Sequence, residues 1–175
     1  MDATAHDFDA FYRCTFAGMV VLATAVTGQR AGAEDVVQDA MLDAHRRWDR
    51  VGGYDSPRAW VRRVVIQRST KVSRKRRNER NAHLRRVGDD APDHGDPALD
   101  PMLATALRSL PVQQRAVLAL HYLEDLSVHD TAELLGITDG TVKTHLSRGR
   151  TALAERLTDI DGGSLTTRRE KEDQP

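Results

Sequence analysis

Apolar residues recur every three or four positions along most of this chain, which is the spacing of one face of an α-helix. The pattern predicts helices over residues 8–26, 33–50 and 56–80, followed by shorter helices between residues 101 and 157. The β-branched residues do not form alternating runs, so strands are not expected. We therefore predict an all-α protein. The aromatic residues near the start (Phe8, Phe11, Tyr12 and Phe16) fit either a binding platform or a core, and their helical spacing favours a core.

Residues 127–157 carry the local signals of a helix-turn-helix. Ser127 and Thr138 each precede a helical pattern, where a hydroxyl can accept hydrogen bonds from the free N–H groups of the first turn. Gly136 lies between the two patterns, where the chain must reverse, and the small Ala132 allows a close approach of the helices. A plain helical hairpin is the alternative. We favour the helix-turn-helix because each of these residues stands where that motif needs it.

The second helix of this motif carries hydroxyls and cations away from its apolar stripe. Such side chains suit the base acceptors and phosphates of a DNA major groove. The candidate DNA-reading residues are Lys143, Thr144, Ser147 and Arg148.

Composition excludes several classes of protein. Cys14 is the single cysteine, so an internal disulfide and a cysteine-rich zinc site are excluded, as in a reducing cytoplasm. The start of the chain is acidic and lacks a signal-peptide layout, and the apolar run at residues 17–26 is too short to span a bilayer. The seven histidines are scattered and lack the spacing of metal ligands. The sequence also contains no glycine-rich phosphate-binding loop. We expect a cytoplasmic protein that is not an enzyme, with no catalytic residues, metal, cofactor or membrane partner.

The formal net charge of zero hides a strongly uneven distribution. Residues 58–86 contain twelve Lys or Arg and one acid, Glu79, a net charge of +11. A helix of this density favours phosphate binding over a merely solvated face. Residues 88–101 then contain five aspartates and three prolines, which is typical of a flexible linker.

These features predict two small helical domains joined by a flexible acidic linker, the second containing the helix-turn-helix. The boundaries are residues 1–87 for the first domain, 88–101 for the linker and 102–157 for the second domain. The polar tail, residues 158–175, is expected to be disordered. The linker composition also suggests that the two domains can sit at any separation.

A second stripe on the predicted helix over residues 33–50 is polar and acidic. Asp35, Gln38, Asp39 and Leu42 share one face, apart from the apolar stripe that includes Val37. From spacing alone this face is equally consistent with a solvated surface and with a docking surface for a basic partner helix.

Three segments together resemble the extracytoplasmic-function (ECF) group of sigma-70 RNA polymerase sigma factors. AEDVVQDAMLDAHRRWDRV is similar to the polymerase-binding part of region 2, and SPRAWVRRVVIQRSTKVSRKRRNER to its promoter-melting and −10-reading part. The segment from Leu110 to Leu157 resembles region 4, which reads the −35 element; Thr131 stands where an aliphatic residue is usual. The resemblance covers about residues 5–157.

The resemblance implies a transcription-initiation factor with core RNA polymerase and promoter DNA as partners. It assigns Asp35, Gln38, Asp39 and Leu42 to the β′ clamp helices, and an apolar surface of region 4 to the β flap. An anti-sigma factor is a further candidate partner. The candidates for the −10 element and the melted strand are Arg62, Arg63, Arg68, Lys71, Arg74 and Lys75. Trp60 could stack on an unpaired base, although its register favours the core. The alternative function is a stand-alone helix-turn-helix regulator.

Overall fold

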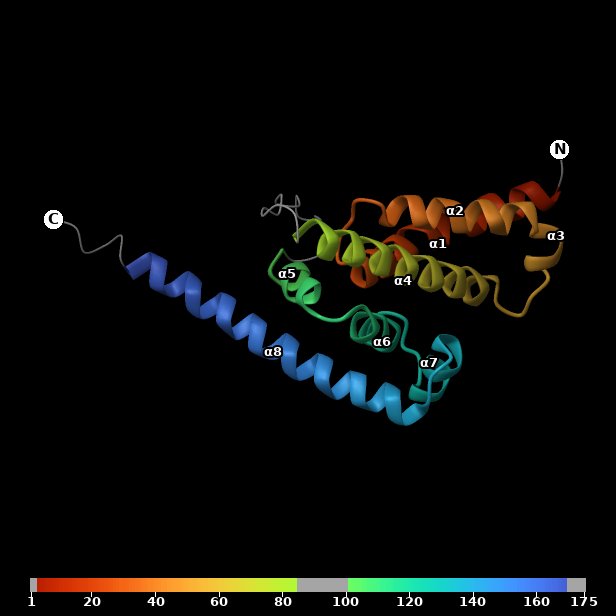
Figure 1. Cartoon of the computed structure of the whole chain (residues 1–175). Helices are drawn as coiled ribbons and strands as arrows, with labels where there is room; N and C mark the ends of the chain where they lie inside the picture. The colour runs from red at the N-terminus through yellow and green to blue at the C-terminus, as the bar shows by residue number, and fades with distance from the viewer. Residues whose placement is uncertain (1–2, 85–100, 170–175) are drawn as a thin grey trace.

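The computed structural model describes residues 3–84 and 101–169, and the regular elements in these ranges are all α-helices (Figure 1). The predicted all-α class is therefore confirmed. In chain order the helices are α1 (Ala3–Thr27), α2 (Ala33–Arg46), α3 (Trp48–Val51), α4 (Pro57–Leu84), α5 (Pro101–Ser109), α6 (Val112–Tyr122), α7 (Val128–Leu135) and α8 (Asp139–Arg169).

The first four helices form a bundle with α1 at its centre. α1 packs against both α2 and α4, and Met19, Leu22 and Val26 are completely buried among them. Phe8 packs edge-on against Trp48, with ring centroids 5.1 Å apart. The prediction that the aromatic residues of this helix belong to the core is confirmed.

The predicted helix over residues 33–50 is divided into two helices. α2 ends at Arg46, and Arg47 leaves the helical conformation with φ −122° and ψ 21°. After this break, Trp48 and Val51 of α3 are both buried. Burial of these two large apolar side chains offsets the interrupted helical hydrogen bonds, a tertiary effect that helical periodicity does not report.

α4 begins where its sequence predicts. The hydroxyl of Ser56 accepts a hydrogen bond from the N–H of Ala59 at 3.2 Å, and Pro57 occupies the first helical position. Proline is favoured there because its φ is already helical and the first N–H groups have no intrahelical partner. The helix ends at Leu84, four residues beyond the predicted end.

The predicted helix-turn-helix is confirmed in α7 and α8. The N–H of Asp130 donates to Ser127 Oγ at 3.0 Å, and the N–H of Thr141 donates to Thr138 Oγ1 at 3.2 Å. Gly136 has φ +66°, a left-handed conformation that favours glycine. α6 packs against both helices of the motif.

The two domains pack directly against each other, which the linker composition did not indicate. α6 of the second domain lies against α1 and α4 of the first (Figure 1). The five successive residues from Ala116 to Leu120 are all buried, so this part of α6 is apolar on every side. A helix of this kind needs partners all round. One side meets the helix-turn-helix, and the other side joins the core of the first domain.

The last helix is longer than predicted. α8 continues to Arg169, although residues from 158 onward were expected to be disordered. The expectation of disorder rested on the polar composition of this tail, and the two glycines at 162 and 163 each cost only about 1 kcal/mol in a helix. The end of α8 extends away from the other helices (Figure 1). The predicted linker lies outside the described residues except for Pro101, where α5 begins, and so do tail residues 170–175.

Within the described residues, one helical segment, Asp7–Thr27, is long and apolar enough to cross a membrane by length and composition. Half of this segment is buried inside the protein, and a core helix of a soluble protein passes the same test. Since α2, α4 and α6 pack against it, its apolar surface is that of a core helix.

Candidate functional site

The first candidate surface is the N-terminal half of α8. Lys143, Thr144, Ser147 and Arg148, the predicted DNA-reading residues, are all exposed and share one face of the helix. The opposite face is fixed by Val142 and Leu146, which are buried against the rest of the domain. Thr144 donates its hydroxyl hydrogen to the carbonyl of Gly140 at 2.8 Å, so an oxygen lone pair and a methyl group remain for DNA.

The contact between α8 and α6 fixes the rotation of this surface. Gly149 is buried, and a Cβ atom there would lie 2.9 Å from Leu118 Cδ1. Such a distance is shorter than van der Waals contact, so any side chain at this position would force Leu118 or the helix itself to shift. The candidate residues one and two positions before Gly149 therefore point away from α6 and into solvent.

The second candidate surface is α4, where the six predicted residues divide into two groups. Arg63, Lys71, Arg74 and Lys75 are exposed, because Val61, Val65 and Ile66 turn another side of the helix into the core. Arg62 and Arg68 are instead paired with carboxylates from other elements, whereas Lys75 lies 3.8 Å from Glu79 of α4 itself. The exposed group presents the kind of basic face that phosphates attract.

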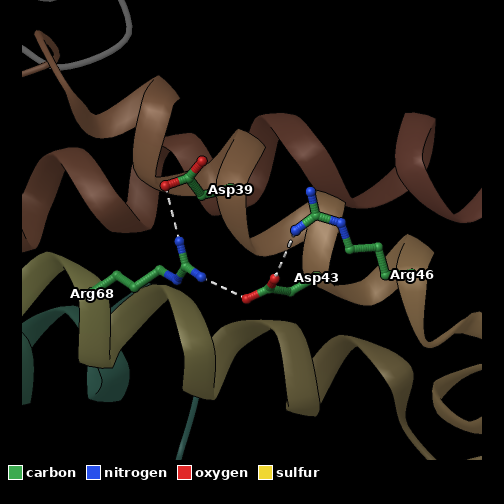
Figure 2. Close-up of polar contacts among 4 residues, drawn as sticks. All are labelled: Asp39, Asp43, Arg46 and Arg68. Carbon is green, nitrogen blue, oxygen red and sulfur yellow. Dashed lines mark hydrogen bonds and ion pairs between the residues drawn. The ribbon is translucent and has the colours of Figure 1, made fainter.

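Arg68 connects α4 with the acidic side of α2 (Figure 2). Its guanidinium donates to Asp39 at 2.9 Å and to Asp43 at 2.5 Å. Arg46 approaches the other oxygen of Asp43 at 3.7 Å. One guanidinium fork therefore bridges two carboxylates one helical turn apart, which fixes α2 against α4.

The third candidate surface is the outer face of α2. Asp35, Gln38, Asp39 and Leu42 are all exposed, and the helix buries its other side through Val37 and Met41. Leu42 is 51% exposed and is one of four large apolar side chains that are exposed among the described residues. It borders a cavity of about 390 Å³ that is also lined by Phe8, Tyr12, Gln38, Met41 and His45.

Trp60 has features of both proposed roles, packing in the core and stacking on an unpaired base. Its side chain is half-buried and packs against the first core. It also lines a surface cavity of about 310 Å³, together with Tyr54 and Arg63 from the first domain and Leu126 and Glu133 from the second.

Three residues of this region, Arg58, Arg115 and Glu124, were not predicted from the sequence as parts of the site. Glu124 follows α6 and contacts Arg58 and the predicted Arg62, and buried Arg115 of α6 donates to main-chain carbonyls of α1. Arg115 could have been noticed as a cation beside a run of apolar residues. Glu124 stands in an ordinary polar turn, and nothing in its sequence context marks it.

Among the described residues, no group of three or more His, Cys, Asp and Glu side chains could hold a metal ion. The surfaces are instead a basic helix, a helix-turn-helix and an acidic helix face with an exposed leucine. A basic helix beside a helix-turn-helix is the arrangement expected of a DNA-binding protein, and the exposed face of α2 is a candidate surface for a protein partner.

Two family models match the chain. "Sigma-70 region 2" matches residues 18–79, and "Sigma-70, region 4" matches residues 101–153. The ECF RNA polymerase sigma factor SigM of Mycobacterium tuberculosis is 30% identical over 156 residues, covering 89% of this chain and 80% of SigM. The RNA polymerase sigma-E factor of Streptomyces avermitilis is 29% identical over 172 residues, covering 96% of this chain and 94% of the relative.

Among solved structures, the sigma factor RpoE of Bartonella quintana, in complex with the anti-sigma factor NepR, is similar with a TM-score of 0.70. The identity is 25%, and the match covers 87% of this chain and 97% of that chain. The chain belongs to the ECF group of sigma-70 RNA polymerase sigma factors. Proteins of this family bind core RNA polymerase and promoter DNA and direct transcription initiation, which they do without catalysing a reaction. A stand-alone regulator would not account for the region 2 match.

Proposed function

We propose that this chain is a cytoplasmic sigma factor whose three exposed surfaces have separate tasks. The outer face of α2 binds the β′ clamp helices of core polymerase. The exposed basic face of α4 binds the −10 region and the melted strand, and the N-terminal half of α8 reads the −35 element. The first domain comprises residues 1–87 and the second comprises residues 102–157.

The observation that carries this proposal is the exposure of Leu42 between the acidic residues of α2. Single exposed apolar side chains also occur on solvated faces, but Leu42 borders a cavity lined by aromatic and apolar side chains, and a docking partner gains free energy by covering both. Asp35 and Asp39 complement a basic helix, and the cavity lined by Tyr12 and His45 can accept an apolar side chain from it.

A second apolar surface supports docking of the other domain on the β flap. A cavity of about 380 Å³ lies among α5, α6 and α8, lined largely by leucine side chains, including Leu103, Leu118 and Leu153. Tyr122 and Leu123 at its edge are exposed at 53% and 45%. A protruding apolar segment of the polymerase fits such a surface.

An anti-sigma factor is a further proposed partner. The support is the solved complex of a 25% identical sigma factor with its anti-sigma factor, which extends over most of this chain.

Core binding can be tested with the double variant Asp35→Lys, Leu42→Ala. Asp39 is left unchanged because its reversal would also break the contact with Arg68. We expect at least tenfold weaker core binding, a change of about 1.4 kcal/mol. The melting temperature should change little, because both side chains are exposed.

The matched control is Asp55→Lys, a charge reversal at an exposed residue between α3 and α4. It should bind core polymerase like the wild type. Equal core affinity of the double variant and the control, measured by fluorescence anisotropy with labelled sigma factor, would show that this face of α2 is merely solvated.

A further inference from the structure

Two exposed hydroxyl groups of α8 are held by the backbone of the helix itself. Thr144 donates its hydroxyl hydrogen to the carbonyl of Gly140 at 2.8 Å, and Thr151 donates to the carbonyl of Ser147 at 3.2 Å. The side chain of Ser147 makes no hydrogen bond within the described residues. A hydroxyl has one hydrogen to donate and two lone pairs with which to accept. While these bonds hold, the two threonines can only accept from an approaching partner, whereas Ser147 can also donate.

Thr144 stands where a helix-turn-helix reads base edges. It is the sixth residue of α8, and the N-terminal part of the second helix is the part that contacts bases in the major groove. Gly140 lies one turn earlier and is exposed, and a helical side chain leans toward the N-terminus of its helix, so Thr144 lies over this glycine. Val142 and Leu146, two positions to either side, are buried, which turns Thr144 toward solvent. No side chain on the preceding turn therefore shields Thr144 from a base pair.

The groups that Thr144 leaves free are an acceptor oxygen and a methyl group, and base pairs differ in how they suit them. Guanine presents only acceptors in the major groove, which a hydroxyl without a free hydrogen cannot satisfy. Adenine presents its N6 amino donor, and its partner thymine presents a methyl group. Cytosine also presents an amino donor, but a G·C pair has no methyl group. An A·T pair therefore offers a partner to both free groups of Thr144.

We propose that Thr144 selects an A·T pair at one position of the −35 element. Its oxygen accepts from adenine N6, and its methyl group packs against the thymine methyl. The selection depends on the hydrogen bond to Gly140, because a released hydroxyl would also donate to guanine. This inference rests on the proposed reading of the −35 element by α8, and it names the base pair that one residue of α8 reads.

The test uses the holoenzyme of this chain with core polymerase and a promoter library in which every −35 position carries each of the possible base pairs. Transcripts are counted by sequencing. Thr144→Ala removes both free groups, Thr144→Val removes the oxygen and keeps a methyl group, and Thr144→Ser keeps the oxygen and removes the methyl group. The matched control is Thr151→Val, which removes a hydroxyl held in the same way on the same face of α8, about two turns farther from the N-terminus.

We expect the wild type to favour A·T over G·C about tenfold at one −35 position, within the usual range for a base contact. Thr144→Ala should lower this preference to about twofold or less, and Thr144→Val and Thr144→Ser should each retain about threefold. Thr151→Val should retain the full preference. Both threonines are exposed, so each variant should keep nearly the melting temperature of the wild type.

Base analogues at the selected position identify the atoms that are involved. Deoxyuridine lacks the thymine methyl group, and purine lacks the adenine amino group. Deoxyuridine should weaken transcription with the wild type and with Thr144→Val, but not with Thr144→Ser. Purine should weaken transcription with the wild type and with Thr144→Ser, but not with Thr144→Val. Such paired changes isolate the interaction between one group of the protein and one group of the DNA.

The outcomes separate this inference from the proposed function. If Thr144→Ala leaves every preference unchanged while Lys143→Ala or Arg148→Ala alters one, α8 reads the −35 element and selection by Thr144 is wrong. Loss of a preference for G·C in Thr144→Ala would show that the hydroxyl leaves Gly140 to donate to guanine, which contradicts the inference as well. A uniform loss of transcription with all these variants, Lys143→Ala and Arg148→Ala included, would overturn the proposed reading by α8 together with this inference.

Discussion

The candidate DNA-binding cations of α4 and α8 differ in how they interact with the rest of the chain. In α8 the candidate residues Lys143 and Arg148 are exposed, and the opposite face is held by contacts within one domain. In α4 two of the six candidates, Arg62 and Arg68, contact acids from other parts of the chain. A cation on a helix surface is therefore less available to DNA when a carboxylate of the same chain already pairs with it.

The two helices also depend on different neighbours. The orientation of α8 is set by α6 and α7, which belong to its own domain. The accessibility of α4 depends on α2 through Arg68 and on the second domain through Glu124. The candidate −35 surface is therefore fixed within one domain, whereas two cations of the candidate −10 surface are paired with carboxylates from other elements.

The largest expected effect on stability comes from disrupting the close contact between α8 and α6. Gly149→Leu would place a side chain where a Cβ atom alone lies 2.9 Å from Leu118. We expect a loss of about 3 kcal/mol in the free energy of unfolding, at the upper end of the overpacking range. Urea denaturation measures this.

The control in the same helix is Gly140→Ala, whose nearest contact would be Thr138 Oγ1 at 3.9 Å. It should keep or slightly raise the stability, because alanine favours helix more than glycine does. Similar stability of both variants would mean that α8 does not need close contact with α6.

The next effect separates reading of bases from binding of phosphates. In the holoenzyme, Lys143→Ala or Arg148→Ala should change the preference at one −35 position by about 1–3 kcal/mol. Arg74→Gln with Lys75→Gln should lower transcription equally from all −35 variants and reduce permanganate reactivity of the melted strand. A library of −35 variants in an in vitro transcription assay measures both. A uniform loss with the α8 variants would show that α8 also binds only phosphates.

The smallest effect concerns α7, which supports α8. Thr131 is completely buried, and its hydroxyl has no partner among the described residues. Thr131→Val removes this hydroxyl and should stabilise the protein by about 1 kcal/mol. Thermal unfolding measures the change. Thr158→Val is the control, because that hydroxyl is exposed and donates to the carbonyl of Ala154 at 2.9 Å, so no gain is expected.

The parts of the fold that depend on local chemistry could be predicted from the sequence. Ser127 and Thr138 cap their helices as expected, Ser56 caps α4 at the start of its predicted range, and Gly136 adopts the left-handed turn. These features need only a few neighbouring residues, so their signals are contained in short segments. The helical periodicity also placed the aromatic residues of α1 in the core, since an amphipathic face must be covered by something.

The parts that depend on distant segments could not be predicted. Spacing showed which residues share a face of α4, but not that Arg68 contacts Asp39, 29 positions away, or that Arg62 contacts Glu124, 62 positions away. The flexible linker suggested independent domains, because composition describes the connection and not the surfaces at its two ends. The base-reading, strand-binding and polymerase-binding roles of the candidate residues stay predictions until the variants are measured.

Arg115 has a consequence for tracing the contact between the two domains through evolution. Its partners on the first domain are the carbonyl oxygens of Val26 and Thr27, which any residue at those two positions would also supply. Correlated substitutions reveal contacts only when both sides have a side chain that can vary. This contact would leave no paired signal in a comparison of related sequences, and residues 26 and 27 could drift while the contact persisted.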